Sequence, residues 1–213
     1  MNLLLACIAV TAGGAAALLV AEYKQSLLAK CIAKPLASTG FVALALVGGA
    51  LQGAYGVAIV AALVLSWIGD VLLIARRSPW FRLGILAFLL AHVAFVVAFA
   101  VRGMSITYAA ASLLVMAPVG VVVGRWLLGR VQPELRSAVA SYIAVITVMV
   151  AAAAGTVGAA GGAEILLAAL AFYVSDLSVA LHRFVSPKLS HRIWGVPLYF
   201  GAQLLLAWSA TRG

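Results

Sequence analysis

Long apolar runs without charge constrain this chain more than any other feature of its sequence. Five runs contain no Asp, Glu, Lys or Arg: 2–21, 83–101, 103–124, 137–163 and 193–211. Residues 35–75 carry only Asp70, and residues 165–182 carry only Asp176. A helix of ~20 apolar residues spans the hydrocarbon core of a bilayer, and continuous runs differ from the alternating pattern of barrel strands. The sequence therefore predicts an all-α membrane protein.

The runs divide into eight predicted transmembrane helices, because the sequence GGALQG at 48–53 separates two spans within 35–75. The predicted helices are 2–21, 35–51, 54–75, 83–101, 105–124, 137–156, 163–182 and 193–211. Only 9% of the residues are charged, and no predicted loop is long enough for a soluble domain. We therefore expect one integral membrane domain over residues 1–213. Since no basic segment precedes the first run, we interpret it as a retained span.

The basic residues support this count of helices. Twelve of the 14 Lys and Arg residues follow the first, third, fifth or seventh predicted helix. They are Lys24, Lys30, Lys34, Arg76, Arg77, Arg82, Arg125, Arg130, Arg136, Arg183, Lys188 and Arg192. Because cytoplasmic loops are enriched in Lys and Arg, we predict a multi-pass protein of the cell (inner) membrane with both termini extracytoplasmic.

The net charge of +9 also bears on partners. It favours attraction to the anionic headgroups of membrane lipids. Nucleic-acid binding is the weaker interpretation, because no basic domain is predicted outside the membrane. Cys7 and Cys31 fall near opposite ends of the first predicted helix, too far apart for a disulfide. The histidines lack the spacing of zinc ligands, so we expect neither a metal nor a cofactor.

Two aspartates lie inside apolar helices, in segments that resemble each other. Residues 66–77 read SWIGDVLLIARR, and residues 172–183 read FYVSDLSVALHR. In both, an aromatic residue precedes the Asp by three positions, a small residue precedes it directly, and an Arg follows it by seven. A charged side chain at a helix centre costs ~2.5–3.5 kcal/mol on insertion scales, so such residues are usually functional. The matched pair of Asp70 and Asp176 predicts one site with two carboxylates.

The similarity continues into the following helix and suggests an internal repeat. The matching positions are Gly84 and His92 in one copy and Gly195 and Gln203 in the other. The repeats would cover 1–101 and 105–211 with four helices each, and an even number of spans gives them parallel orientation. Chance resemblance between apolar helices is the alternative.

The predicted topology places both aspartates at one depth. Asp70 precedes Arg76 by six residues and Asp176 precedes His182 by six, which corresponds to ~9 Å at 1.5 Å per residue. Tyr142 and Tyr199 fall at a similar depth by the same count. We predict that the two carboxylates face each other across a contact between their helices, with the tyrosines nearby and the site open toward the cytoplasm.

The remaining candidates are expected to bind substrate around this pair. They are Lys34, His92, Tyr142, Arg183, Tyr199 and Gln203. Lys34 and Arg183 mark the cytoplasmic rim, and His92 and Gln203 lie nearer the midplane. Structural roles compete with this interpretation: Asp70–Arg77 and Asp176–Arg183 could be ion pairs two turns apart. His92 and Gln203 could be interhelical hydrogen-bonding groups.

The order and helix placement of these residues resemble the YhhN-type family of eight-helix membrane proteins, whose characterised members are lysoplasmalogenases. The resembling elements are Lys34-Pro35 opening the second predicted helix, Gly69-Asp70, Ala91-His92, Tyr142, Ser175-Asp176, and Tyr199 with Gln203-Leu204-Leu205. They extend over roughly residues 34–205. The resemblance implies hydrolysis of the vinyl-ether bond of a lysoplasmalogen, a lysophospholipid, to a fatty aldehyde and a glycerophospho-headgroup compound.

That reaction is compatible with two carboxylates. A vinyl ether is protonated on its β-carbon, and water attacks the resulting oxocarbenium ion. One protonated Asp could supply the proton while the other, ionised, stabilises the cation and activates water, as glycosidases divide labour between carboxylates. The sequence leaves open which aspartate takes which role. Lys34 or Arg183 could hold the phosphate.

Two further functions fit the same residues. Parallel repeats with paired intramembrane acids also describe a small proton-coupled transporter of a lipid or metabolite. A non-catalytic lipid-binding or assembly protein would have dispensable aspartates. The headgroup preference, the chain preference and the oligomeric state are open at this stage.

Overall fold

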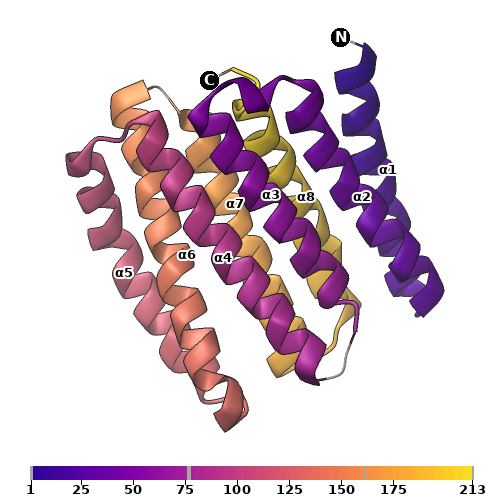
Figure 1. Cartoon of the computed structure of the whole chain (residues 1–213). Helices are drawn as coiled ribbons and strands as arrows, with labels where there is room; N and C mark the ends of the chain where they lie inside the picture. Colours follow the sequence, from indigo (N-terminus) through magenta and orange to yellow (C-terminus); the bar gives the residue numbers. More distant parts are fainter. Residues whose placement is uncertain (1, 76–77, 161, 213) are drawn as a thin grey trace.

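The computed structural model describes residues 2–75, 78–160 and 162–212, which fold as eight α-helices joined by short turns (Figure 1). The helices are α1 (Asn2–Tyr23), α2 (Leu27–Val47), α3 (Ala54–Leu72), α4 (Ser78–Arg102), α5 (Ile106–Leu128), α6 (Pro133–Ala160), α7 (Ala163–Ala180) and α8 (Leu189–Ser209). A 3₁₀ turn, η1 (Ala50–Gln52), precedes α3, and a π-helical turn, η2 (Leu181–Val185), extends α7. The described residues contain no strand, which confirms the all-α class.

Seven of the eight described helices, α1 to α7, are long and apolar enough to cross a membrane. A helix suits this environment because it satisfies its own backbone N–H and C=O groups where water is absent. α8 has 21 residues but is less apolar, because it includes Arg192 and Gln203. The chain is therefore a multi-pass membrane protein with seven candidate spans among the described residues.

The second helix begins earlier than predicted. We expected it to open at Lys34-Pro35, but α2 begins at Leu27 and contains Pro35. Ser26 caps it, with the side-chain oxygen accepting from the backbone N–H of Ala29 at 3.3 Å. The prediction was wrong because it confined lysines to loops. A long lysine side chain can instead leave the helix and reach a polar partner.

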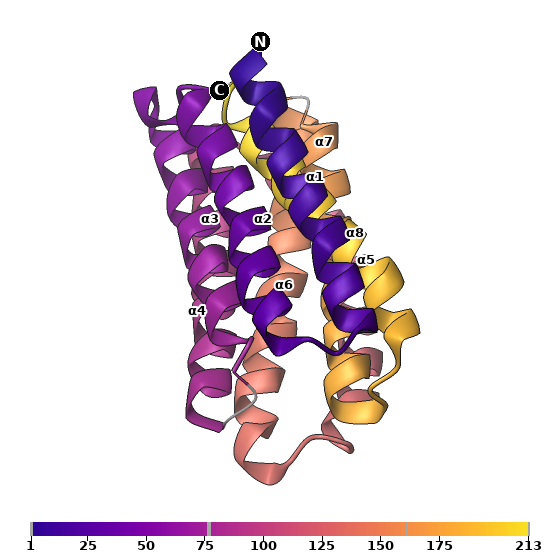
Figure 2. The same ribbon diagram turned by 90° about the vertical axis from the view of Figure 1, so that its right-hand side faces the viewer.

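The helices form four consecutive antiparallel hairpins. α1 packs on α2, α3 on α4, α5 on α6 and α7 on α8. α4 and α7 both pack against α6, and α8 also contacts α1 and α2. In Figure 1, α5 lies at one edge, α1 at the other, and both termini lie at the same end of the bundle. Figure 2, viewed from the α1 edge, shows α1 in front of α8, with α2 beside α1.

The helices that carry the two aspartates are not close neighbours. The main interfaces of α3 are with α4 and α2, and those of α7 are with α8 and α6. A direct α3–α7 interface, which we predicted, is therefore wrong for the described residues. Arg76 and Arg77 lie outside those residues, as does the Asp70–Arg77 ion pair considered above.

Candidate active site

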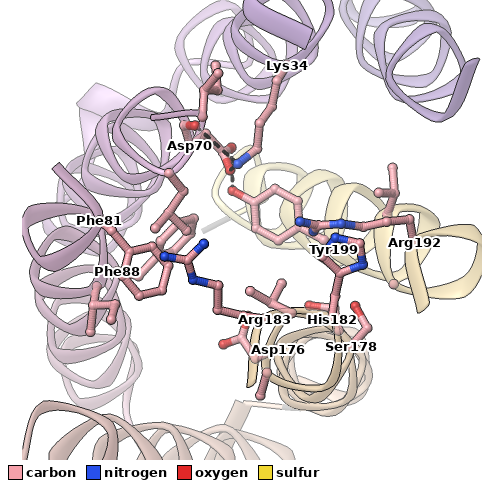
Figure 3. A pocket seen from close by; sticks show the side chains of 18 of the residues that line it. Lys34, Asp70, Phe81, Phe88, Asp176, Ser178, His182, Arg183, Arg192 and Tyr199 are labelled. Atoms are coloured by element: carbon pink, nitrogen blue, oxygen red, sulfur yellow. Dashed lines mark hydrogen bonds and ion pairs between the residues drawn. The ribbon is translucent and has the colours of Figure 1, made fainter. Parts of the chain in front are cut away.

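A cavity of about 1070 Å³ lies inside the bundle, and all eight α-helices contribute to its wall. Both aspartates line it, Asp70 from α3 and Asp176 from α7. Figure 3 shows them on opposite sides of the cavity. The two carboxylates thus share one cavity although the main interfaces of their helices are with other helices.

Asp70 is almost fully buried and is surrounded by donors. Its Oδ1 lies 3.0 Å from Lys34 Nζ. Its Oδ2 accepts hydrogen bonds from Ser38 Oγ at 2.5 Å and Tyr199 OH at 2.6 Å. All three contacts suit an ionised carboxylate, which only accepts hydrogen bonds. Lys34 Nζ also donates to the backbone oxygen of Asp70 at 3.1 Å, which fixes α2 against the end of α3.

The residues around Asp70 follow from the local sequence. Lys34 and Ser38 are four residues apart and share one face of α2. Tyr199 is held from behind by Gln203, whose Nε2 donates to the tyrosine oxygen at 3.1 Å. A Cβ at Gly69 would lie 2.6 Å from Cδ2 of Phe88, so only glycine lets α4 approach here. The small residue before the aspartate is thus a packing requirement.

Asp176 has fewer donors. Its Oδ2 accepts from Tyr142 OH at 2.5 Å, and His92 Nε2 lies 3.6 Å from the same oxygen. The other ring nitrogen of His92, Nδ1, lies 2.5 Å from the backbone oxygen of Phe88. A carbonyl oxygen can only accept, so Nδ1 carries a proton there. In a neutral ring Nε2 is then an acceptor that faces the carboxyl group.

One end of the cavity carries charged side chains, which we call the charged rim: Glu22, Lys30, His182, Arg183 and Arg192. Glu22 Oε2 lies 2.6 Å from Lys30 Nζ, and Glu22 Oε1 lies 3.7 Å from Arg192 Nε. The guanidinium of Arg183 stacks over the ring of Phe81, 4.1 Å from its centroid. In Figure 3 the Arg183 side chain extends toward Phe81, with His182 and Arg192 on the other flank.

The π-helical turn η2 positions two members of the charged rim. It contains His182 and Arg183, and it closes with a hydrogen bond from Ser186 N–H to the oxygen of Leu181 at 2.8 Å. His182 Nδ1 donates to the backbone oxygen of Lys188 at 3.2 Å. π-helical turns are rare and are frequent at functional sites, since they shift the direction of neighbouring side chains.

The opposite flank of the cavity is apolar, and we call it the apolar lobe. It is formed by side chains of α4, α5 and α6: Ile85, Val123, Leu127, Val139, Ile143 and Ile146. A cavity with a charged rim and an apolar lobe matches an amphiphile with one polar and one apolar end.

The predicted site residues fall into two groups. Those that line the cavity are Asp70, Asp176, Lys34, Tyr142, Arg183 and Tyr199. His92 and Gln203 lie behind this wall, fully buried, and contact Asp176 and Tyr199 respectively. Lys34 was expected at the rim but is paired with Asp70.

Sequence reasoning missed some residues of the site, among them Ser38, which contacts Asp70. Ser38 could have been found, because it lies one helical turn after Lys34. Glu22, Lys30 and Arg192 were considered only as topology signals or left aside, although all three line the cavity. Their convergence depends on the packing of α1, α2 and α8, which the sequence does not display.

Comparison with known proteins identifies the family. A bovine (Bos taurus) protein named lysoplasmalogenase TMEM86A is 32% identical over 155 residues, which cover 70% of this chain and 63% of the relative. The match therefore extends over somewhat less than two thirds of that protein's length. No solved structure matches significantly. The profile of the YhhN family matches residues 29–210, most of the chain, and this protein therefore belongs to the YhhN family.

Proposed function

We propose that this protein is an intramembrane hydrolase that cleaves the vinyl-ether bond of a lysoplasmalogen into a fatty aldehyde and a glycerophospho-headgroup compound. Family membership and the relative's name support this activity. The observation that carries the proposal is the placement of Asp70 and Asp176 on opposite sides of one cavity, which has both a charged rim and an apolar lobe.

The cavity suits a lysophospholipid with one chain. The phosphate would lie at the charged rim near Arg183 and Arg192, because guanidinium groups bind phosphate oxygens in a forked geometry. The alkyl chain would lie in the apolar lobe of α4, α5 and α6. The vinyl-ether bond joins the chain to the glycerol, so it would fall between these two regions.

We assign Asp176 as the acid and Asp70 as the ionised partner. Asp70 accepts from Lys34, Ser38 and Tyr199, an environment that requires acceptor oxygens. Asp176 faces the acceptor nitrogen of a neutral His92. Two acceptors would repel each other, and a proton on Asp176 removes that conflict.

The reaction then proceeds in balanced steps. Asp176 gives its proton to the β-carbon of the vinyl ether, which leaves an oxocarbenium ion next to the ionised Asp70. Water attacks the α-carbon while a carboxylate takes its proton. The resulting hemiacetal collapses to the aldehyde and releases the glycerol hydroxyl. A buried anion beside the cation lowers the barrier because both lie in a medium of low dielectric constant.

The activity is tested with purified protein in detergent. A vinyl-ether lysolipid should release aldehyde, and the corresponding saturated ether should release none, because it has no double bond to protonate. Absence of aldehyde from the native protein with several headgroups would overturn the proposal. A transporter remains the competing function from the sequence, and no observation of the structure or of the relatives favours it.

We also propose that all eight helices span the inner membrane as two parallel four-helix repeats. α8 has 21 residues, or ~31 Å at 1.5 Å per residue, which matches a bilayer core of ~30 Å. It packs against α7, α1 and α2, as a member of the bundle would. The α3–α4 and α7–α8 hairpins each carry one of the two aspartates, which supports the repeat.

The proposed topology predicts on which side of the membrane two positions of the chain lie. A reporter fused after Gly213 should report the extracytoplasmic side, and one inserted near Pro133 should report the cytoplasm, because most basic residues lie in the helix ends and loops on the latter side. Paired alkaline phosphatase and fluorescent-protein fusions measure both. A cytoplasmic C-terminus would contradict eight spans with both ends outside.

Removing single tyrosine hydroxyls should distinguish the two aspartates. Tyr142→Phe removes a donor that would stabilise the carboxylate formed as Asp176 releases its proton. We expect roughly a tenfold loss in kcat, since a hydrogen bond to a charged group contributes ~1.5–3 kcal/mol. Tyr199→Phe should cost less, because Lys34 and Ser38 still hold Asp70. Tyr173 also lines the cavity, and Tyr173→Phe is the matched control with near-native activity. Equal losses in all three variants would contradict the assignment.

A further inference from the structure

The charged rim contains one carboxylate among its cations. Glu22, in the last turn of α1, has a side chain that is 13% exposed and lines the cavity. Three permanently basic residues share the rim with it: Lys30, Arg183 and Arg192. A carboxylate close to a bound phosphate is repelled by it. A site that binds only an anion would therefore bind it more tightly without Glu22.

Both oxygens of Glu22 are oriented by neighbouring cations. Lys30 Nζ lies 2.6 Å from Oε2, which is a short charge-assisted hydrogen bond. Arg192 Nε lies 3.7 Å from Oε1, beyond hydrogen-bond range. A carboxylate has about four acceptor positions, so Glu22 can accept a further donor while Lys30 stays in place.

We propose that Glu22 recognises the ammonium group of a zwitterionic phosphodiester headgroup, while Arg183 and Arg192 hold its phosphate. A primary ammonium fits best, because its three N–H donors match the free acceptor positions of a carboxylate. This inference rests on the proposed function, since it assumes that a lysolipid occupies the cavity. It assigns Glu22 as a residue that determines headgroup specificity.

The positions of these residues allow both contacts at once. The end of α1, the start of α2, η2 and the start of α8 meet at the same end of the bundle, as the order of the hairpins requires. Arg183 comes from η2 and Arg192 from α8, and Glu22 lies against Arg192 on the α1 side. Phosphate and ammonium are adjacent in such a headgroup, and Glu22 lies beside Arg192, one of the two arginines that would hold the phosphate.

The test uses two saturated-ether lysolipids that differ in one group. One carries a phosphoethanolamine headgroup, and the other carries the matched 2-hydroxyethyl phosphate, with OH in place of NH₃⁺. Native protein in detergent should bind the amine about tenfold more tightly, the factor that ~1.4 kcal/mol gives. Glu22→Gln should bring this ratio close to one, mainly through weaker binding of the amine. Glu22→Asp should keep part of the preference.

The control is Glu134→Gln, which makes the same change at an exposed position near the start of α6 and should keep the native ratio. An equal loss of affinity for both lipids in Glu22→Gln would assign Glu22 to neutralising the rim and overturn the inference. A native protein without preference would also overturn it, whether or not Glu22→Gln folds.

Aldehyde release from vinyl-ether versions of the two lipids separates this inference from the proposed function. Amine preference in binding without aldehyde release would overturn the hydrolase and leave the role of Glu22 intact. Aldehyde release with the same kcat/KM for both headgroups would support the hydrolase and overturn the role of Glu22.

Discussion

Replacing either aspartate by asparagine is expected to lower the rate of aldehyde release by ~10²–10⁴-fold, the range for loss of a general acid or base. Asparagine is nearly isosteric, but it can neither deliver the proton nor carry the charge. Asp176→Asn removes the proposed proton donor. Asp70→Asn removes the anion that stabilises the oxocarbenium ion and helps to activate water. Both changes act on kcat, because the charged rim and the apolar lobe remain to bind the lipid.

The double variant adds a sharper expectation. Asp70→Asn combined with Asp176→Asn should be little worse than either single change, because groups that act as a unit are not additive. Glu164→Gln is the matched control, since Glu164 lies in the first turn of α7 and is not among the residues that line the cavity. Aldehyde is measured after gel filtration confirms folded protein. Near-native activity in either single variant would exclude the two-carboxylate mechanism.

The sequence was most informative where a charged residue lies inside an apolar segment. Asp70 and Asp176 could be singled out because a carboxylate is costly in hydrocarbon. The depth count also selected Tyr142 and Tyr199, and each donates to one of the aspartates. These predictions needed only the helix rise and the charged ends of the helices. The structure brings the four side chains to the wall of one cavity.

The ends of the helices and the packing partners of each helix were harder to predict from the sequence. Charged residues defined the predicted ends, so the lysine-bearing first two turns of α2 were excluded from the helix. The partners of Lys30 and Lys34 are Glu22 and Asp70, on other helices. No local pattern reveals such pairs, because they depend on which helices pack together. For the same reason the sequence predicted an interface between α3 and α7, while their main interfaces are with other helices.

Lys34 illustrates how this difference changes the chemistry. At the rim it would hold a phosphate, and its loss would raise KM. Beside Asp70 it balances a buried charge, with 2% side-chain exposure for the aspartate and 19% for the lysine. Its loss would then destabilise the protein and disturb the ionised carboxylate. The rim position therefore predicts a raised KM when Lys34 is replaced, whereas the position beside Asp70 predicts lower stability.

Lys34→Met should therefore lower the thermal stability of the protein in detergent. Breaking a fully buried ion pair costs ~3–5 kcal/mol, because one charge is left without its partner. The cost here should be smaller, since Lys34 is partly open to the cavity. Asp70→Asn alone should cost less than Lys34→Met, because the introduced amide carries no charge and the flexible lysine can turn toward the cavity.

The decisive variant combines both changes. Adding Asp70→Asn to Lys34→Met should recover stability, because the unpaired buried charge is removed. Lys34→Arg is the conservative control and should keep most of the native stability. The coupling comes from melting temperatures of the four proteins of the double-mutant cycle. Losses of stability that simply add would show that Lys34 and Asp70 do not stabilise each other. A raised KM in Lys34→Met with native stability would indicate that Lys34 binds the phosphate of the substrate. Strong coupling would instead identify Lys34 as the partner that compensates the buried carboxylate of Asp70.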